Sequence, residues 1–253
     1  MKIRLVYFLI IVLVAKNTNA QQLPPIQLDR PDQTECPFIV PEHYIQAENG
    51  FTFERVNSGM SNSSTPTILW KYGLHQRFEF RLITEWNTMK LPEARYQGLA
   101  PVTIGFKTSI CKENGLVPMT SVICHLTSAN IGSKDFHTPY LAPSFRFTMQ
   151  HTLSSRFSLA YNLGAEWDGN SAAENYLYTL TSGISITEKL GCYLELYGFA
   201  AKKQKPDHRC DGGFTFLLNQ NMIADISGGF ALSKDSPERY LSLGFSYRFK
   251  VVK

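Results

Sequence analysis

The sequence has no long apolar run after residue 20, where no segment approaches the roughly 18 continuous apolar residues of a membrane-spanning helix. A bundle of membrane helices is therefore excluded. Charged residues are also sparse, at 18% of the chain against 43% hydrophobic residues, and such a chain is too apolar to remain disordered. Aromatic residues reach 13% of the chain, and this content favours β-structure.

The short motifs of metal and catalytic sites are missing as well. No CxxC, CxxH or HxxxH spacing occurs, so no metal site is predicted. The sequence has no G-x-S-x-G motif, and the pair His151 and Ser154 has a spacing expected by chance, so no catalytic residue and no cofactor is predicted. The odd number of cysteines leaves at least one unpaired, and thiols in strands are expected to act as small apolar groups. The five cysteines are Cys36, Cys111, Cys124, Cys192 and Cys210.

Residues 1–20 predict a signal peptide that is cleaved after Ala20. Lys2 and Arg4 form a basic start, and residues 5–14 are continuously apolar. This run is too short for a stable membrane anchor, which is the alternative interpretation. Cleavage removes three basic residues and leaves 22 basic against 21 acidic residues, in place of 25 against 21. The composition therefore indicates no nucleic-acid partner.

Alternation of apolar and polar residues is the main signal in the rest of the chain. In residues 240–249 every odd position is Leu, Phe or Tyr, whereas the even positions include Ser242 and Arg248. Successive side chains of a strand point to opposite faces, so each such segment has one apolar and one polar face. Twelve segments are predicted, near residues 43–57, 66–76, 77–88, 99–111, 117–127, 140–151, 156–168, 175–187, 190–202, 208–218, 221–232 and 238–250.

The connections between these segments fall into two alternating groups. The first group is tight, at residues 75–77, 112–116, 152–155, 187–189 and 219–221. The second is mostly longer and more polar, at residues 58–65, 89–98, 128–139, 169–174, 203–207 and 233–237. This alternation is typical of an outer-membrane barrel, with the tight set in the periplasm. The sequence thus predicts an all-β fold: an antiparallel up-and-down transmembrane β-barrel of about twelve strands, with short periplasmic turns, longer extracellular loops and a last strand that pairs with the first.

Alternation by itself leaves open which face meets which solvent, because a soluble sandwich turns its apolar face inward and a membrane barrel turns it to lipid. Small residues and charges of both signs on the polar faces, with Trp and Tyr near strand ends, favour the barrel. The polar faces would then line the lumen. The candidate lumen-lining residues are Glu54, Lys71, Glu79, Arg81, Lys107, Arg146, Glu166, Asp225 and Arg248.

Residues 21–42 form a proline-rich N-terminal arm, called the arm below, ahead of a barrel at residues 43–253. Its five prolines predict an extended periplasmic segment that leads into the first strand and plugs the base of the barrel. A disordered tail is the alternative.

The arm contains the sequence D-R-P-D-Q-T-E-C-P from Asp29 to Pro37. It resembles the D-R-P-D-x-T-E-S-P motif of bacterial outer-membrane proteins named for the MetA pathway of phenol degradation, in the form common in Bacteroidetes; Cys36 replaces the serine. The resemblance implies an outer-membrane barrel that carries small hydrophobic or aromatic compounds. Charged arm residues would pair with the lumen wall, at Glu54, Lys71, Arg146 or Arg248. The motif residues are Asp29, Arg30, Pro31, Asp32, Thr34 and Glu35.

Three functions remain open from the sequence. The first is a passive outer-membrane channel or transporter for small solutes. The second is a structural or interaction barrel whose lumen is closed by paired charges and the arm. The third and least expected is a membrane hydrolase. The expected partners are outer-membrane lipid, the outer-membrane assembly machinery and an unidentified small solute.

Overall fold

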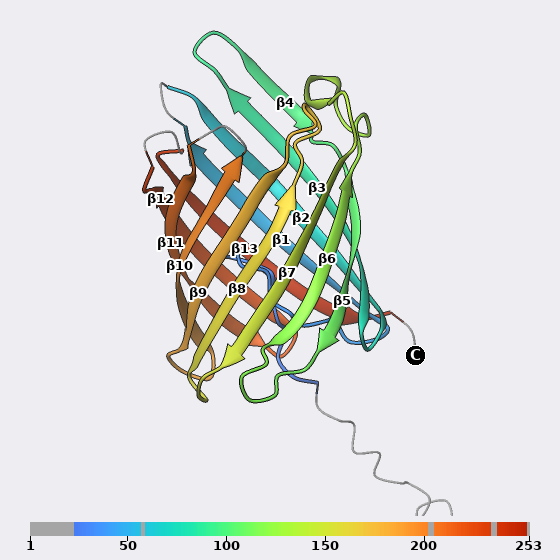
Figure 1. Ribbon diagram of the computed structural model, residues 1–253, viewed down its shortest axis with the longest axis vertical. Coiled ribbons are helices and arrows are strands. Elements are labelled where there is room, and N and C mark those ends of the chain that lie inside the picture. The colour runs from blue at the N-terminus through green and yellow to red at the C-terminus, as the bar shows by residue number, and fades with distance from the viewer. Residues whose placement is uncertain (1–22, 57–58, 202–204, 234–236, 252–253) are drawn as a thin grey trace, which may run out of the picture.

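The computed structural model describes residues 23–56, 59–201, 205–233 and 237–251, so the predicted signal peptide lies outside the described residues. The described chain forms a closed antiparallel barrel of twelve strands, with one further short strand, β4, attached to β3 (Figure 1). The strands are β1 (Tyr44–Arg55), β2 (Ser61–His75), β3 (Phe78–Lys90), β4 (Arg95–Leu99), β5 (Thr103–Cys111), β6 (Met119–Thr127), β7 (Ala142–Thr152), β8 (Phe157–Glu166), β9 (Asn175–Ser185), β10 (Leu190–Ala201), β11 (Asp207–Asn219), β12 (Met222–Ala231) and β13 (Arg239–Lys250).

Each barrel strand pairs with its neighbour in the sequence, and the sheet closes where β1 meets β13. In that pair Ile45 lies opposite Phe249 and Arg55 lies opposite Arg239, so the two strands are matched over their whole length. Closure leaves the barrel strands without free edges, which a sheet surrounded by hydrocarbon requires. The predicted fold class and the predicted pairing of the last strand with the first are confirmed.

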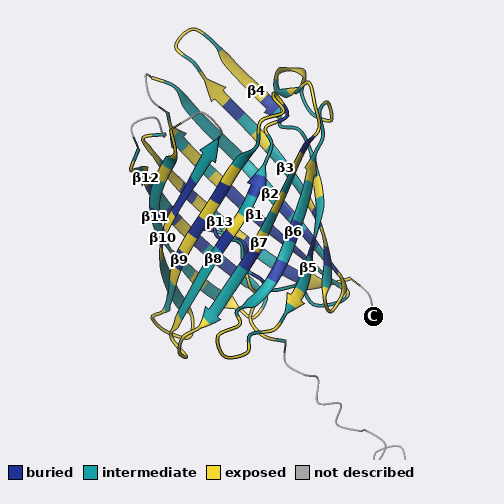
Figure 2. Ribbon diagram, in the orientation of Figure 1, coloured by how far each residue is buried: buried dark blue, intermediate teal, exposed yellow. Residues whose placement is uncertain are grey.

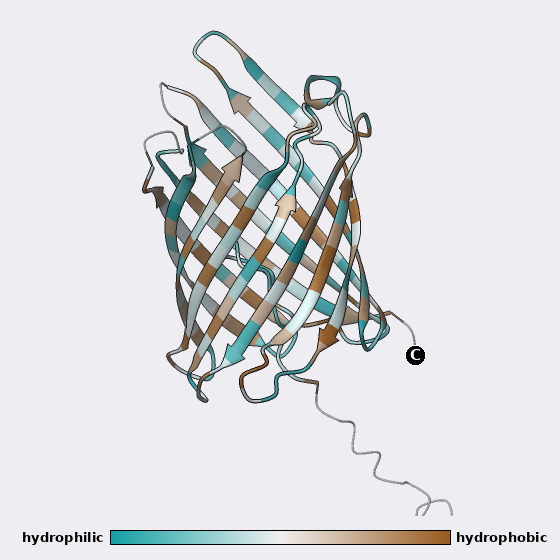
Figure 3. Cartoon of the chain, in the orientation of Figure 1, coloured by the Kyte–Doolittle hydropathy of each residue, from teal (hydrophilic) through white to brown (hydrophobic). Residues whose placement is uncertain are grey.

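The alternation in the sequence becomes an outward apolar face and an inward polar face. On β13, Leu241 and Leu243 are exposed on the outside, at 49% and 45%, whereas Ser242 and Ser246 are buried inside. The same banding of buried and exposed, and of hydrophilic and hydrophobic, runs along the strands in Figures 2 and 3. Most of the fully buried side chains are accordingly polar, which is the reverse of a soluble core.

Two predictions of local structure are wrong. The loop predicted at residues 89–98 is instead a hairpin, in which the end of β3 pairs with β4 and Met89 faces Tyr96. This hairpin projects beyond the barrel (Figure 1), so neither of its faces needs the apolar pattern that signals a strand. The second strand begins at Ser61 rather than at residue 66, and its pairing register shifts between Ser64 and Thr67. Pro66 lies in that irregularity, where a residue without an N–H is tolerated.

The two groups of connections lie at opposite ends of the barrel (Figure 1). Tight turns join β2 to β3 and β9 to β10 at one end, called the turn end. The opposite end, called the loop end, carries the β3–β4 hairpin and the connection from β6 to β7, which includes a short 3₁₀ helix at Lys134–Phe136. No helix in the described part of the chain is long and apolar enough to cross a membrane.

Candidate functional site

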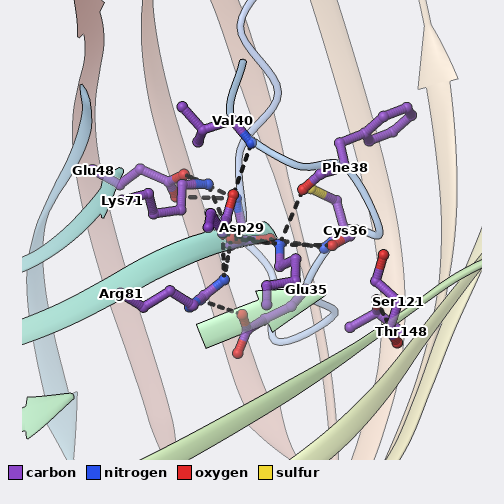
Figure 4. Close-up of polar contacts among 12 residues, drawn as sticks. Asp29, Glu35, Cys36, Phe38, Val40, Glu48, Lys71, Arg81, Ser121 and Thr148 are labelled. Carbon is purple, nitrogen blue, oxygen red and sulfur yellow. Dashed lines mark hydrogen bonds and ion pairs between the residues drawn. The ribbon is translucent and has the colours of Figure 1, made fainter. Parts of the chain in front are cut away.

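The arm lies inside the barrel. It enters at the turn end, where the Arg248 guanidinium donates to the Pro24 carbonyl oxygen at 2.9 Å and the Ile26 N–H donates to the Gln220 carbonyl oxygen at 3.0 Å. It then rises into the lumen and returns to the turn end before β1, where the His43 N–H donates to the Gly73 carbonyl oxygen at 2.8 Å (Figures 1 and 4). The segment predicted as a periplasmic plug therefore occupies the lumen itself.

Asp29 is the centre of the contacts between arm and wall (Figure 4). Its carboxylate forms ion pairs with three cations. The Lys107 Nζ lies 2.7 Å from a carboxylate oxygen, the Lys71 Nζ 2.9 Å and an Arg81 guanidinium nitrogen 2.9 Å. All four side chains are buried. Three cations around one carboxylate are stable only with further anions nearby, because an uncompensated buried charge is costly.

Those further anions come from the wall and from the arm. Glu48 on β1 pairs with Lys71, and Glu79 on β3 lies 3.3 Å from Arg81. Glu35 on the arm pairs with Arg81 at 2.5 Å and lies 3.6 Å from Arg146 of β7. The cluster contains four carboxylates and four cations, so its formal charge is zero. Its members are Asp29, Glu35, Glu48, Glu79, Lys71, Arg81, Lys107 and Arg146.

Arg30 points to β12 and β13, the strands that follow β1 around the barrel on the side away from β2. Its guanidinium donates to Asp225 of β12 at 3.1 Å and to the Ser242 hydroxyl of β13 at 2.9 Å. Two glycines that face each other in the β1–β13 pairing make room for this contact. A Cβ on Gly50 would lie 2.1 Å from the Arg30 guanidinium, and one on Gly244 would lie 2.1 Å from the Asp225 carboxylate. The lack of side chains here lets the arm's arginine lie flat against the wall.

Thr34 attaches the arm to β9 and β10. Its hydroxyl lies 2.5 Å from the Thr179 hydroxyl and donates to the Glu195 carboxylate at 2.5 Å. The Gln33 N–H donates to the same carboxylate at 2.7 Å. On β8, the Asn162 side chain accepts from the Glu35 N–H and donates to the Glu35 carbonyl oxygen, at 2.7 and 3.0 Å. This pair of bonds holds the arm backbone as a neighbouring strand would.

Cys36 and the residues after it complete the attachment. The Lys107 Nζ donates to the Cys36 carbonyl oxygen, the Ser121 hydroxyl donates to the Pro37 carbonyl oxygen, and the Val40 N–H donates to Glu79. Among the described residues, hydrogen bonds link the arm to every barrel strand except β11. The arm is therefore held from nearly the whole circumference of the wall. All five cysteines are unpaired in the structure.

Cavities remain around the arm in the described part of the barrel, and three of them lie along its length. The turn-side cavity has a volume of about 410 Å³ and lies between the arm and the turn ends of the strands from β7 to β12. The middle cavity, of about 260 Å³, is lined by side chains such as Glu54, Glu85 and Arg209. The loop-side cavity, of about 410 Å³, is lined by Glu166, Arg209 and the connection from β8 to β9. The turn-side and loop-side cavities lie towards opposite ends of the barrel, and each has a volume that can hold small molecules.

Asp168, in the β8–β9 connection, lines the loop-side cavity. The backbone N–H groups of Asn170 and Ser171 donate to its carboxylate at 2.8 and 3.0 Å. These hydrogen bonds lower the pKa of Asp168 below its ordinary value, so the group is anionic at neutral pH.

The family model described as "Putative MetA-pathway of phenol degradation" matches residues 28–249. The chain belongs to this family. The matched range starts one residue before the arm motif and ends in β13, so it covers both the arm and the barrel. The resemblance identified from the motif is confirmed.

The barrel is similar to solved outer-membrane structures, whereas no curated protein matches the sequence. An outer membrane channel from Pseudomonas putida F1 is similar over 88% of this chain and 100% of its own, with 12% identity and a TM-score of 0.66. The KdgM porin in complex with disordered oligogalacturonate is similar over 81% and 99%, with 12% identity and a TM-score of 0.57. The NanC porin is similar over 80% and 98%, with 8% identity and a TM-score of 0.54. At such identities the similarity establishes a shared fold.

In this member of the phenol-degradation family, the motif residues are the contact residues of the arm. Asp29, Arg30, Thr34 and Glu35 each bond to the wall, and Pro31 and Asp32 line the cavities. Of the nine wall residues predicted from alternation, seven contact the arm: Lys71, Glu79, Arg81, Lys107, Arg146, Asp225 and, at the start of the arm, Arg248.

Among the described residues, no hydrogen bond or ion pair links the other two predicted wall residues to the arm. Glu54 lies 3.5 Å from Arg209 of β11, and Glu166 accepts from Asn175 of β9 at 3.3 Å. Both lie nearer the loop end, above the arm, and line cavities there.

The sequence reasoning missed several wall residues that bond to the arm. Glu48 and Glu195 are fully buried acceptors for the arm, and Asn162 clamps its backbone. Alternation could have identified Glu195, because Leu194 and Leu196 flank it and are exposed on the outside at 63% and 48%. Nothing in a single sequence could show that these residues face the same arm.

Proposed function

We propose that this protein is an outer-membrane channel through which small solutes diffuse passively. The observation that supports this best is that cavities of about 410 and 260 Å³ lie on opposite sides of residues 30–32, which line both of them. We call residues 30–32 the partition. A barrel filled solidly with side chains would leave no such spaces. Because the partition separates the cavities, passage requires the arm to shift.

The surface of the barrel supports an outer-membrane location. Its outward residues are apolar around the whole circumference, for example Phe80 on β3, Leu163 on β8 and Phe214 on β11, which are about half exposed. Hydrocarbon is the solvent that such a surface matches, and a closed barrel leaves no backbone group unpaired within it. We therefore propose outer-membrane lipid and the outer-membrane assembly machinery as partners of this protein. The strand that the assembly machinery would recognise is β13, the aromatic last strand of the barrel.

The cavity linings narrow the class of solute. The middle cavity is lined by hydroxyl, amide, carboxyl and guanidinium groups from both the wall and the arm. Such a lining favours small solutes that can form hydrogen bonds, and this class includes the phenolic compounds of the family's name. We propose no enzymatic activity.

Single-channel recording tests this function. The purified protein, reconstituted in a planar bilayer, should show discrete conductance steps smaller than those of general porins, because the arm occupies much of the lumen. Vesicles that contain it should also swell in an isotonic solution of a small neutral sugar, whereas protein-free vesicles should not. Absence of both steps and solute flux would contradict a channel.

The alternative is a structural barrel with a permanently closed lumen. The number of arm–wall hydrogen bonds favours it. A closed barrel predicts no conductance in the wild-type protein, and deletion of the gene would then weaken the envelope without changing solute uptake.

A further inference from the structure

The arm is bound unequally to the two sides of the barrel. Towards β1–β7 it forms the neutral cluster of four carboxylates and four cations around Asp29. Towards β9–β13, its one ion pair with the wall is that of Arg30 with Asp225, among the described residues. Hydrogen bonds from Gln33 and Thr34 to β9 and β10 also hold the arm there, but a displacement on the β9–β13 side breaks fewer buried ion pairs than one on the β1–β7 side.

The three cavities form a series along that weaker side. Arg209 of β11 lines both the loop-side and the middle cavity. The partition, residues 30–32, lines both the middle and the turn-side cavity. Among the described residues, two elements separate the cavities of this series, and each includes an arginine that is paired with a carboxylate, Arg209 with Asp207 and Arg30 with Asp225.

The described wall and rim of the upper two cavities carry an excess of negative charge. Six carboxyl groups line them against two cations, Lys205 and Arg209. The six are Glu54, Glu85, Glu166, Asp168, Glu174 and Asp207. On the arm itself, Arg30 and Asp32 balance each other. A cleft of one sign between low-dielectric walls concentrates counter-ions and excludes co-ions.

Buried acceptor atoms on β11 and β12 also lack a partner. Asp211 of β11 is 2% exposed, and its Oδ1 has no hydrogen-bond partner, whereas its Oδ2 accepts from the Tyr240 hydroxyl at 2.5 Å. The Ser227 hydroxyl oxygen of β12, also 2% exposed, is without a partner. Neither residue lines one of the three cavities, so these oxygen atoms add buried acceptor groups to the β11–β12 wall behind the route rather than contacts on it.

We infer that solutes cross between the partition and the β9–β13 side of the barrel, and that this route selects cations over anions. The inference rests on the proposed channel function and adds its route and its charge class. Small cationic solutes, and zwitterions that present an ammonium group, are the solutes that this lining fits.

Reversal potentials in a potassium chloride gradient test the inference. Wild-type channels should be several-fold more permeable to potassium than to chloride. The double variant Glu85→Gln/Glu166→Gln should lower this ratio clearly below the wild-type value, because it halves the excess of negative charge on the route from four to two. Neither carboxylate takes part in a described ion pair; Glu85 accepts from the Ser64 and Thr67 hydroxyls and Glu166 from Asn175. The barrel should therefore fold normally.

A matched control removes two carboxylates that line none of the three cavities. Glu93→Gln/Glu113→Gln changes the β3–β4 hairpin and the β5–β6 turn, and should leave the permeability ratio as in the wild type. Anion preference in the wild type, or equal ratios in wild type and Glu85→Gln/Glu166→Gln, would overturn the inference but leave the channel function standing. Absence of any conductance, with or without Asp29→Asn, would instead overturn the channel function and the inference together.

Discussion

Replacing Asp29 by asparagine should free the arm and raise the single-channel conductance several-fold. The substitution keeps the size of the side chain but leaves Lys71, Arg81 and Lys107 without the anion they share. Removing one partner of a buried ion pair costs about 3–5 kcal/mol, and here the loss falls on the docking of the arm rather than on the barrel. Channel recordings should show larger or more frequent open states.

Asp135→Asn is the matched control for this prediction. Asp135 is an exposed residue of the 3₁₀ helix at the loop end, and no described ion pair includes it. The single-channel conductance of the Asp135→Asn variant should equal that of the wild type. If Asp29→Asn instead conducted like the wild type and unfolded at the same temperature, the three cations would not depend on Asp29, and the arm would not be held as the structure indicates.

Placing an arginine on the outward face, by Leu243→Arg, should strongly impair insertion into lipid. Leu243 lies near the middle of β13 and points out of the barrel at 45% exposure. An arginine at the bilayer midplane of such a barrel costs about 2–4 kcal/mol. The free energy of unfolding from phospholipid vesicles, measured by urea titration, should fall by that amount.

The same substitution at Leu116 separates the effect of lipid from that of the arginine itself. Leu116 is 97% exposed in the β5–β6 turn, at the end of the barrel, so Leu116→Arg should leave the free energy of unfolding nearly unchanged. A barrel in which both variants were equally stable would not have its outward face in hydrocarbon.

The strands could be predicted from the sequence because each barrel strand separates two solvents. Leu241 and Ser242 belong to different faces, and the alternation that results is visible without any partner strand. Where both faces meet the same surroundings the pattern fails: residues 61–65 of β2 and the whole of β4 have no apolar face, and the sequence therefore predicted loops there.

The candidate site could be predicted only as two separate sets of residues. The arm motif supplied Asp29 and Glu35, and alternation supplied Lys71, Arg81 and Lys107 as lumen-facing residues. That all five meet depends on the path of the arm inside the barrel and on the register of strands far apart in the sequence, which local patterns do not encode. The sequence could predict that charged residues of the arm form ion pairs with the wall. It could not predict that Asn162 and Glu195 bond to the arm, because this depends on the arm's position.

A reversible cross-link between arm and wall tests the central claim, that the arm controls the lumen. The hydroxyl oxygens of Thr34 and Thr179 lie 2.5 Å apart, so cysteines at these two positions are close enough to form a disulfide. With the native cysteines replaced by serine, and in the Asp29→Asn background, oxidation should reduce the single-channel conductance and dithiothreitol should restore it. Equal conductance in the oxidised and reduced channels would contradict the account.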